Sequence, residues 1–179
     1  MVEVPPVESL SDDSTPSPAS PVHVEAAGPA DFGRIAELTA GVYRDEGLAP
    51  EAYLSELADV AGRADRAQLL VARDGGAVVG SVALVLEGDF GEITASEDEA
   101  SFRMLVVDPA ARGRGVGELL VTTCLTRAQA AGKRRTVIST DPRMVAAHRI
   151  YERLGFVRLP ERDWSPLPGV TLMAYTKDL

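Results

Sequence analysis

The stretch SFRMLVVDPAARGRGVGELL, residues 101–120, joins an apolar segment to a glycine-rich turn and then to an apolar helical pattern. The segment 101–107 has the length and apolar character of a buried strand. Asp108 and Pro109 end it, because proline lacks the N–H donor that a sheet ladder needs. This part of the chain therefore predicts a strand, a turn and a helix in direct succession.

The turn itself carries Gly113, Gly115 and Gly117, with Arg112 and Arg114 beside them. Unpaired N–H groups and the positive end of the dipole meet at a helix N-terminus, so an anion is favoured there. Glycine lets the backbone approach that anion without a Cβ in the way. The turn therefore predicts a site for a phosphate or diphosphate.

Two common phosphate motifs do not fit this turn. A Walker A loop needs Lys and then Ser or Thr after its last glycine, whereas Glu118 and Leu119 follow Gly117. A dinucleotide fingerprint needs Gly-x-Gly-x-x-Gly, and the third glycine has the wrong interval. The pattern Arg-x-x-Gly-x-Gly from Arg112 to Gly117 instead resembles the acyl-CoA pyrophosphate loop of the GNAT (Gcn5-related N-acetyltransferase) superfamily.

A second segment, AAHRIYERLGF at 146–156, is similar to a later helix of the same superfamily, which ends in Tyr, three residues and Gly-Phe. The resemblance covers residues 22–179. It implies an α/β fold of the mixed α+β kind, with a central mixed sheet of six to seven strands flanked by about four helices. The periodicity of the chain agrees with this order. We expect strands at 22–27, 68–73, 77–86, 101–107, 136–140, 156–159 and 170–176, and helices over 31–42, 50–60, 116–131 and 142–154.

Length and composition indicate one domain of residues 22–179 after a tail at 1–21 that is rich in Pro, Ser and Asp and is predicted to be disordered. The net charge of -9 disfavours nucleic-acid binding, which needs clustered cations.

A single cysteine, Cys124, forms no internal disulfide, and its place in an apolar helical stripe predicts a core position. No signal peptide or membrane span is recognised, so we expect a cytoplasmic location.

The resemblance implies that acetyl-CoA is the co-substrate and that an amine attacks its thioester directly. Backbone groups of Leu105, Val106 and Val107 would pair with the pantetheine arm. The pyrophosphate would be held by Arg112, Gly113, Arg114, Gly115, Val116 and Gly117.

Two proton transfers remain in such a reaction. A phenol can protonate the departing thiolate, and Tyr151 occupies the position that serves as this acid in many members of the superfamily. The resemblance also implies that a carboxylate near the start of the strand at 101–107 accepts the proton of the amine, directly or through water. Glu99 is the first candidate, with Glu97 and Glu92 after it, although a solvated acidic loop explains all three.

Some residues of this chain differ from the superfamily pattern, so the roles of the corresponding residues in relatives are not assigned to them. Met144 stands where many relatives place Asn, and His148 is interpreted as a partly exposed helix residue. With two histidines and no ligand spacing, a metal site is not expected. Segments 43–53 and 162–170 would wall the acceptor, and Trp164 either lines that wall or pins its loop.

The sequence thus predicts an N-acetyltransferase for a primary amine of a small molecule or peptide, in a chain that forms either a monomer or a homodimer. The alternatives are a protein N-terminal or lysine acetyltransferase and a non-catalytic acyl-CoA-binding regulatory module.

Overall fold

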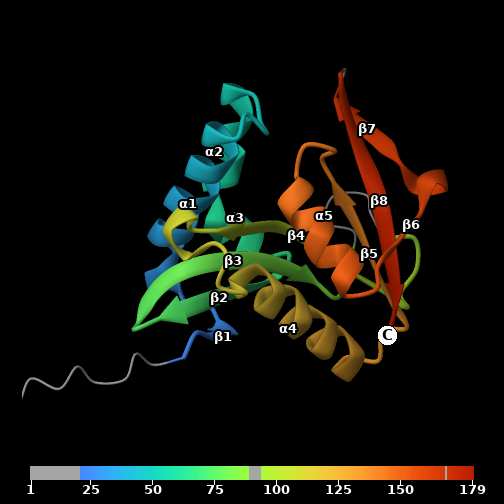
Figure 1. The fold of residues 1–179 in the computed structure, drawn as a ribbon, viewed down its shortest axis with the longest axis horizontal. Coiled ribbons are helices and arrows are strands. Elements are labelled where there is room, and N and C mark those ends of the chain that lie inside the picture. Colours follow the sequence, from blue (N-terminus) through green and yellow to red (C-terminus); the bar gives the residue numbers. More distant parts are fainter. Residues whose placement is uncertain (1–20, 89–93, 168) are drawn as a thin grey trace, which may run out of the picture.

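A computed structural model describes residues 21–88, 94–167 and 169–179. Its sheet has the strand order β1-β2-β3-β4-β5-β8-β6, with β7 paired to β8 (Figure 1). All neighbours are antiparallel except β4 and β5. The strand bounds are β1 His23–Ala26, β2 Gln68–Asp74, β3 Ala77–Val85, β4 Glu99–Val107, β5 Arg135–Thr140, β6 Val157–Arg158, β7 Trp164–Leu167 and β8 Val170–Asp178.

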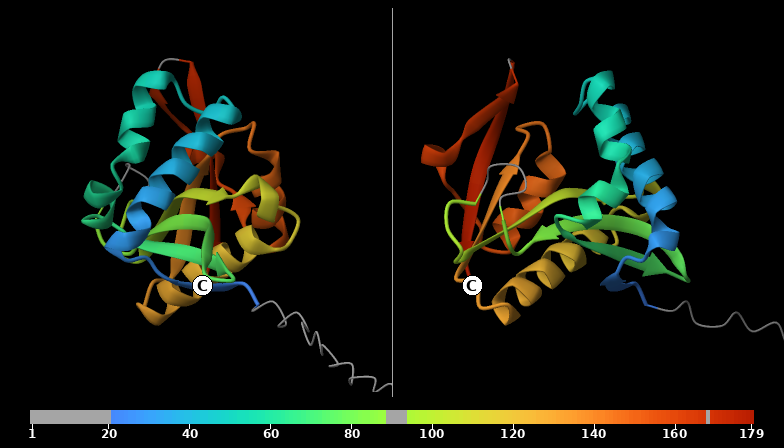
Figure 2. Two further views of the ribbon diagram at one scale, coloured as in Figure 1. Left: turned by 90° about the vertical axis from the view of Figure 1, so that its left-hand side faces the viewer. Right: turned by 180° about the vertical axis from the view of Figure 1, so that it is seen from behind.

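Three helices, α1 to α3, pack on one face of the β1–β4 half of the sheet, and α4 packs on the other (Figures 1 and 2). Side chains alternate along β2 for this reason: Leu69 and Val71 contact the α1 side, whereas Leu70 lies in the α4 core. The fifth helix, α5, packs its Tyr151 into that same core. The helices are α1 Phe32–Asp45, α2 Glu51–Ala58, α3 Val60–Ala64, α4 Val116–Ala130 and α5 Val145–Arg153, with 3-10 turns at Pro29–Asp31, Pro109–Ala111 and Pro160–Arg162.

The β2–β3 hairpin forms where the sequence predicts it. Its turn residues Gly75 and Gly76 have φ angles of 55° and 90°, as a tight hairpin turn requires. The α1 prediction is also confirmed, since Ile35, Leu38 and Val42 are buried. A mixed α/β fold with helices on both sheet faces is therefore confirmed.

β4 and β5 separate soon after they meet. Their parallel pairing consists of Glu99 with Arg135 and Ala100 with Thr136, and no later pair joins them in the described chain. Beyond that point β4 has a bulge, because two of its residues lie opposite one residue of β3 between the pairs Ala83–Arg103 and Ser81–Val106. Within the bulge, Met104 has a φ of 54°, a value uncommon outside glycine. The bulge bends β4 where the gap to β5 opens.

Three local expectations were wrong. Val60 does not belong to the helix that follows Pro50, because α2 ends at Ala58 and Asp59 begins a separate α3 by accepting the N–H of Gly62 at 3.0 Å. Trp164 lies in strand β7 and not in a loop. Glu99 is the first residue of β4 and does not precede the strand, because Arg135 extends the pairing to it.

Some expectations fall on residues that the structure does not describe. Nearly the whole tail predicted at 1–21 lies outside the described residues, as does Glu92. In the described part of the chain, no helix is long and apolar enough to cross a membrane.

Candidate active site

A cavity of about 410 Å³ lies where β4 ends, bounded by the glycine-rich loop, the start of α4 and the β5–α5 connection. Eight of the nine residues that the sequence proposes for the co-substrate line it; Arg114 does not. The predicted residues at the cavity are Leu105, Val106, Val107, Arg112, Gly113, Gly115, Val116 and Gly117. The structure thus gathers this set at one place, and their role as ligands stays a prediction.

The loop conformation leaves donors free at the start of α4. Gly115 is the N-cap residue with a φ of 78°, and it has no side chain to bond the first-turn N–H groups. Those N–H groups have no intrahelical acceptor, and the helix dipole adds partial positive charge at the same point. Residues 115–118 line the cavity, so this helix end faces it.

Gly117 serves packing as well as access. A Cβ at this position would lie 2.9 Å from Cδ1 of Ile150 on α5, closer than carbon atoms tolerate. Gly117 therefore allows α4 and α5 to approach closely beside the cavity.

The arginines of the loop are already paired with carboxylates. Arg112 donates to Glu46 at 2.6 Å, and both residues line the cavity. Arg114 donates to Asp74 at 2.7 Å. A third ion pair, Arg153 with Glu118 at 2.7 Å, lies at the start of α4. Phosphate groups that enter this cavity would compete with these carboxylates, a feature that no local sequence pattern predicts.

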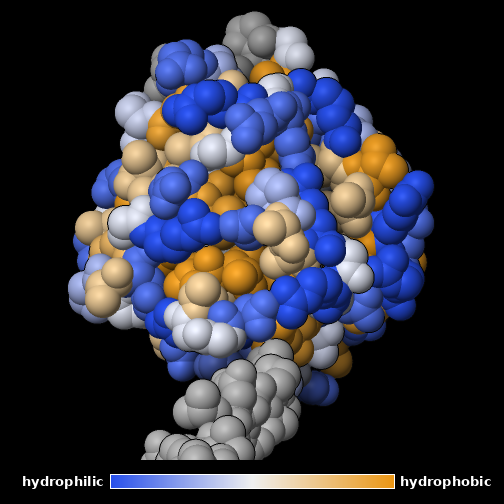
Figure 3. Space-filling view, turned by 60° about the vertical axis from the view of Figure 1, so that its left-hand side comes forward, coloured by the Kyte–Doolittle hydropathy of each residue, from blue (hydrophilic) through white to orange (hydrophobic). Residues whose placement is uncertain are grey.

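The lining fits acetyl-CoA in chemistry. Donors and cations gather around the loop, whereas Val42, Leu105 and Val106 supply apolar walls where the β5-side edge of β4 is unpaired. On the face shown in Figure 3, hydrophobic surface likewise lies in recesses between bands of hydrophilic residues. Diphosphate groups suit the first environment and a pantetheine arm the second.

Tyr151 is buried among aromatic rings. Its side chain is 4% exposed, and its ring centroid lies 5.9 Å from Phe102 and 5.6 Å from Phe156. Burial raises the pKa of its phenol, so the group stays protonated throughout the neutral range. Its neighbours Ala147 and Ile150 on α5 line the cavity, but Tyr151 itself does not. Its role as an acid stays a prediction.

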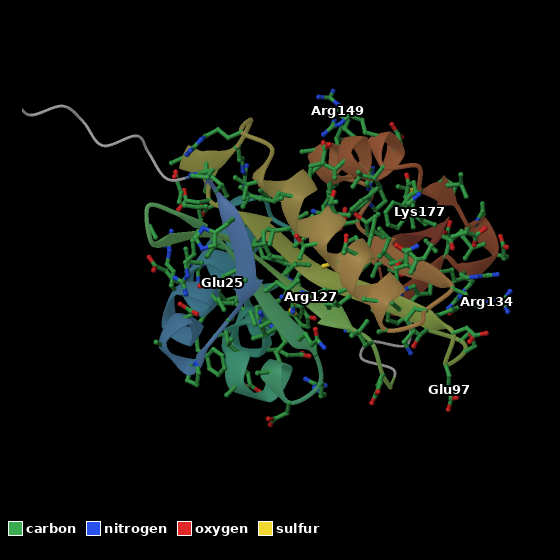
Figure 4. All side chains as sticks on the ribbon, turned by 90° about the horizontal axis from the view of Figure 1, so that it is seen from below. Glu25, Glu97, Arg127, Arg134, Arg149 and Lys177 are labelled. Atoms are coloured by element: carbon green, nitrogen blue, oxygen red, sulfur yellow. The ribbon has the colours of Figure 1, made fainter. Side chains whose placement is uncertain are left out.

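Glu99 is bonded to other residues and lies away from the cavity. Both its carboxylate oxygens lie 3.0 Å from Arg162, and Oε2 accepts the N–H of Ala95 at 2.7 Å. The side chain is 7% exposed and does not line the cavity. These contacts favour a role in holding β4 to the turn before β7. Base function stays untested, and the alternative Glu97 is exposed and labelled at the periphery in Figure 4.

Two other chemically active residues have local explanations. Cys124 is a core residue as predicted, at 1% exposure, and burial raises the pKa of its thiol to about 12. His148 is half-buried against Tyr175, and burial lowers its pKa. Among the described residues, no three His, Cys, Asp or Glu side chains are grouped to hold a metal.

A second cavity of about 560 Å³ lies between the α1–α2 connection, the β5–α5 connection and the start of β8. Its walls overlap the segments 43–53 and 162–170 that the resemblance implies for the acceptor. Trp164 does not line this cavity. Its indole N–H donates to Ser139 at 3.2 Å, and its strand β7 pairs with β8. Arg143 lines both cavities. Sequence reasoning missed this residue, because Asp141-Pro142-Arg143 carries only the signal of a helix start.

The comparisons with known proteins agree with this geometry. A protein-family model described as "Acetyltransferase (GNAT) family" matches residues 34–156 of this chain. An N-acetylaspartate synthetase from Danio rerio is 34% identical over 49% of this chain and 33% of its own length. A mycothiol acetyltransferase from Mycobacteroides abscessus is 35% identical over 70% of this chain and 39% of its own. The matches thus span about a third of the length of these curated relatives.

Solved structures share the fold over nearly their whole length. A GCN5-related N-acetyltransferase from Kribbella flavida has a TM-score of 0.67 and 26% identity, covering 88% of this chain and 98% of its own. A structure from Salmonella typhimurium, described with its cofactor acetyl-CoA, has a TM-score of 0.63 and 20% identity, covering 89% and 95%.

Proposed function

Because this chain belongs to the acetyltransferase (GNAT) family, we propose that it transfers the acetyl group of acetyl-CoA to a primary amine of a small molecule or peptide. One observation carries the proposal. The gap between β4 and β5 places a strand with one unpaired edge, a glycine-rich loop and a helix N-terminus around a single cavity. These three elements supply backbone donors to an extended, strongly anionic thioester.

The proposed roles follow from position. The loop and the α4 N-terminus bind the diphosphate, and β4 from Leu105 to Val107 orients the pantetheine arm and its carbonyl. The amine nitrogen then bonds to the carbonyl carbon while the carbon–sulfur bond breaks. The amine gives its proton to solvent water, the leaving thiolate gains one from Tyr151, and the phenolate of Tyr151 is then reprotonated from solvent. No protein nucleophile takes part, which agrees with the burial of Cys124.

The second cavity is the proposed acceptor site, because Arg143 joins it to the first. The names of two relatives support a small acceptor, because one is named for N-acetylaspartate and the other for mycothiol. Acetylation of a protein N-terminus or lysine is the alternative within the family, and a non-catalytic acyl-CoA-binding module is the alternative outside catalysis.

The test is a binding and turnover measurement on the purified chain. Acetyl-CoA at about a hundred times its dissociation constant should stabilise the fold by about 2.7 kcal/mol, whereas ADP should stabilise it less. CoA release is then measured with small amines, peptides and proteins. Binding without release from any amine would favour the module, and no stabilisation by acetyl-CoA would overturn the proposal.

A further inference from the structure

Arg143 is the residue common to the two cavities. It lies in the connection between β5 and α5, beside Met144 on the co-substrate side and Pro142 on the acceptor side. A group bound by Arg143 in the second cavity therefore lies next to the first. This position suits a residue that orients an acceptor toward the thioester.

The guanidinium of Arg143 is held in place from two directions. Its Nε and Nη2 donate to the two carboxylate oxygens of Asp141 at 2.9 and 2.7 Å, and its Nη1 donates to the carbonyl of Gly47 at 2.7 Å. Three of the five N–H donors are thus used, and the other two have no partner among the described residues. The side chain is 56% exposed, so these donors are open to a ligand.

Asp141 holds the guanidinium of Arg143 in position. The residue is 8% exposed, and its carboxylate also accepts the backbone N–H of Arg143 at 2.8 Å. The bonds from Arg143 lower the pKa of the Asp141 carboxyl, so it stays ionised at neutral pH. His148 on α5 interacts electrostatically with the same carboxylate, and burial lowers the pKa of His148.

The rest of the second cavity offers little charge. Besides Arg143, it is lined by Asp141, whose carboxylate Arg143 engages, and by uncharged residues. The uncharged ones among the described residues are Gly47, Leu48, Ala49, Pro50, Pro142, Gly169, Val170 and Thr171. The lining therefore distinguishes ligands chiefly through Arg143. A planar guanidinium with open donors recognises a carboxylate better than any neutral group of similar size.

We propose that the acceptor is an amino acid, an amine with a carboxylate on the neighbouring carbon, and that Arg143 binds this carboxylate. Asp141 is a positioning residue that holds the guanidinium. The short spacing between the two groups of an amino acid keeps its amine at the boundary between the cavities, facing the thioester. This inference rests on the proposed function, because it names the acceptor class of the same site.

The experiment compares L-amino acids with their own α-carboxamides. An amino acid and its carboxamide have the same side chain, but the α-amine of the carboxamide is less basic than the α-amine of the acid. The carboxamide therefore has more neutral amine at pH 7, and a preference for the acid must come from recognition. For the wild-type chain we expect kcat/KM to be at least ten-fold higher for the better acids than for their carboxamides.

Variants at the site should remove this preference. Arg143→Gln should lower kcat/KM for the acid about ten-fold or more relative to kcat/KM for the carboxamide. Arg143→Lys should retain part of the preference, because it keeps the charge without the planar fork. Asp141→Asn should raise KM for the acid more than it lowers kcat. Arg149→Gln is the matched control: it removes the same charge from an exposed residue of α5 that points away from the sheet (Figure 4).

Binding of acid and carboxamide is measured as well, by thermal shift in the presence of CoA. This readout separates the two claims, since failure of turnover with every amine overturns the proposed function alone. Equal binding of acid and carboxamide overturns the acceptor assignment. So does an Arg143→Gln chain that loses acetyl-CoA affinity but keeps its preference for the acid, since Arg143 would then serve the co-substrate.

Discussion

Arg112 donates to Glu46 across 2.6 Å, although both side chains line the cavity that we propose for acetyl-CoA. The pair joins the end of α1 to the glycine-rich loop. A carboxylate in this place neutralises a cation that the phosphates need and also repels the phosphates. The site is therefore weaker for anions than its loop sequence indicates.

Glu46→Gln should tighten acetyl-CoA binding about two- to five-fold, the range expected for a partly exposed charge pair. The gain should shrink between low salt and about 0.5 M salt, because ions screen exposed charges. Isothermal titration at several salt concentrations measures both effects. Glu37→Gln is the control, since Glu37 pairs with Arg34 on the same helix and lies outside the cavity. Weaker binding by the Glu46 variant would show that this carboxylate helps to build the site.

Tyr151→Phe should lower kcat about a hundred-fold or more and leave acetyl-CoA affinity nearly unchanged, because the variant loses only the proton donor. Steady-state kinetics and titration with acetyl-CoA supply the two numbers. Tyr175→Phe changes a neighbouring phenol whose ring centroid is 6.2 Å away and should keep kcat within about three-fold. Full turnover by the Tyr151 variant would show that Tyr151 has a packing role and does not act as the acid.

Glu99→Gln should reduce stability by about 1 to 3 kcal/mol, because it removes the Glu99 carboxylate from its ion pair with Arg162 in a largely buried place. We expect kcat to stay within about three-fold. Urea unfolding and turnover are measured on the same preparation. A loss of turnover by a hundred-fold at unchanged stability would instead support Glu99 as the base.

Gly117→Ala should cost about 1 to 3 kcal/mol, because the new methyl overlaps Cδ1 of Ile150. Combining it with Ile150→Val, which removes that carbon, should recover part of the loss, and a double-mutant cycle measures the coupling. Gly33→Ala is the control: this glycine lies in α1 with open space at the Cβ position, so alanine should be neutral or stabilising. Additive costs for Gly117 and Ile150 would contradict the steric account.

Asp31→Asn should cost about 1 kcal/mol at pH 7, with a cost that shrinks in acid. The N–H of Gly28, at 2.9 Å, and the Arg73 guanidinium hold the pKa of the Asp31 carboxyl below its usual value near 3.8. The stabilisation is therefore complete above about pH 4 and is lost as pH falls through the lowered pKa of the folded state. Unfolding free energies from pH 7 to pH 2.5 test this, with the exposed Asp65→Asn as control. A constant difference across this range would exclude the carboxylate as the cause.

The sequence by itself determined the order of the main elements, the buried helix and strand faces, and the loop from Arg112 to Gly117. These features are local: side-chain periodicity, proline and glycine positions and the spacing of a turn act over a few residues. The family resemblance carried by this loop implied nine co-substrate residues, and the structure places eight of them at one cavity.

Only the tertiary structure decided which charges meet. Glu46 reaches Arg112, Glu99 reaches Arg162, and Arg143 joins two cavities by contacts with Gly47 across 96 residues of chain. Such pairings depend on how β4 and β5 separate and on where three connections converge. No local pattern records them, because long-range ion pairs follow from packing and leave the periodicity of each segment unchanged.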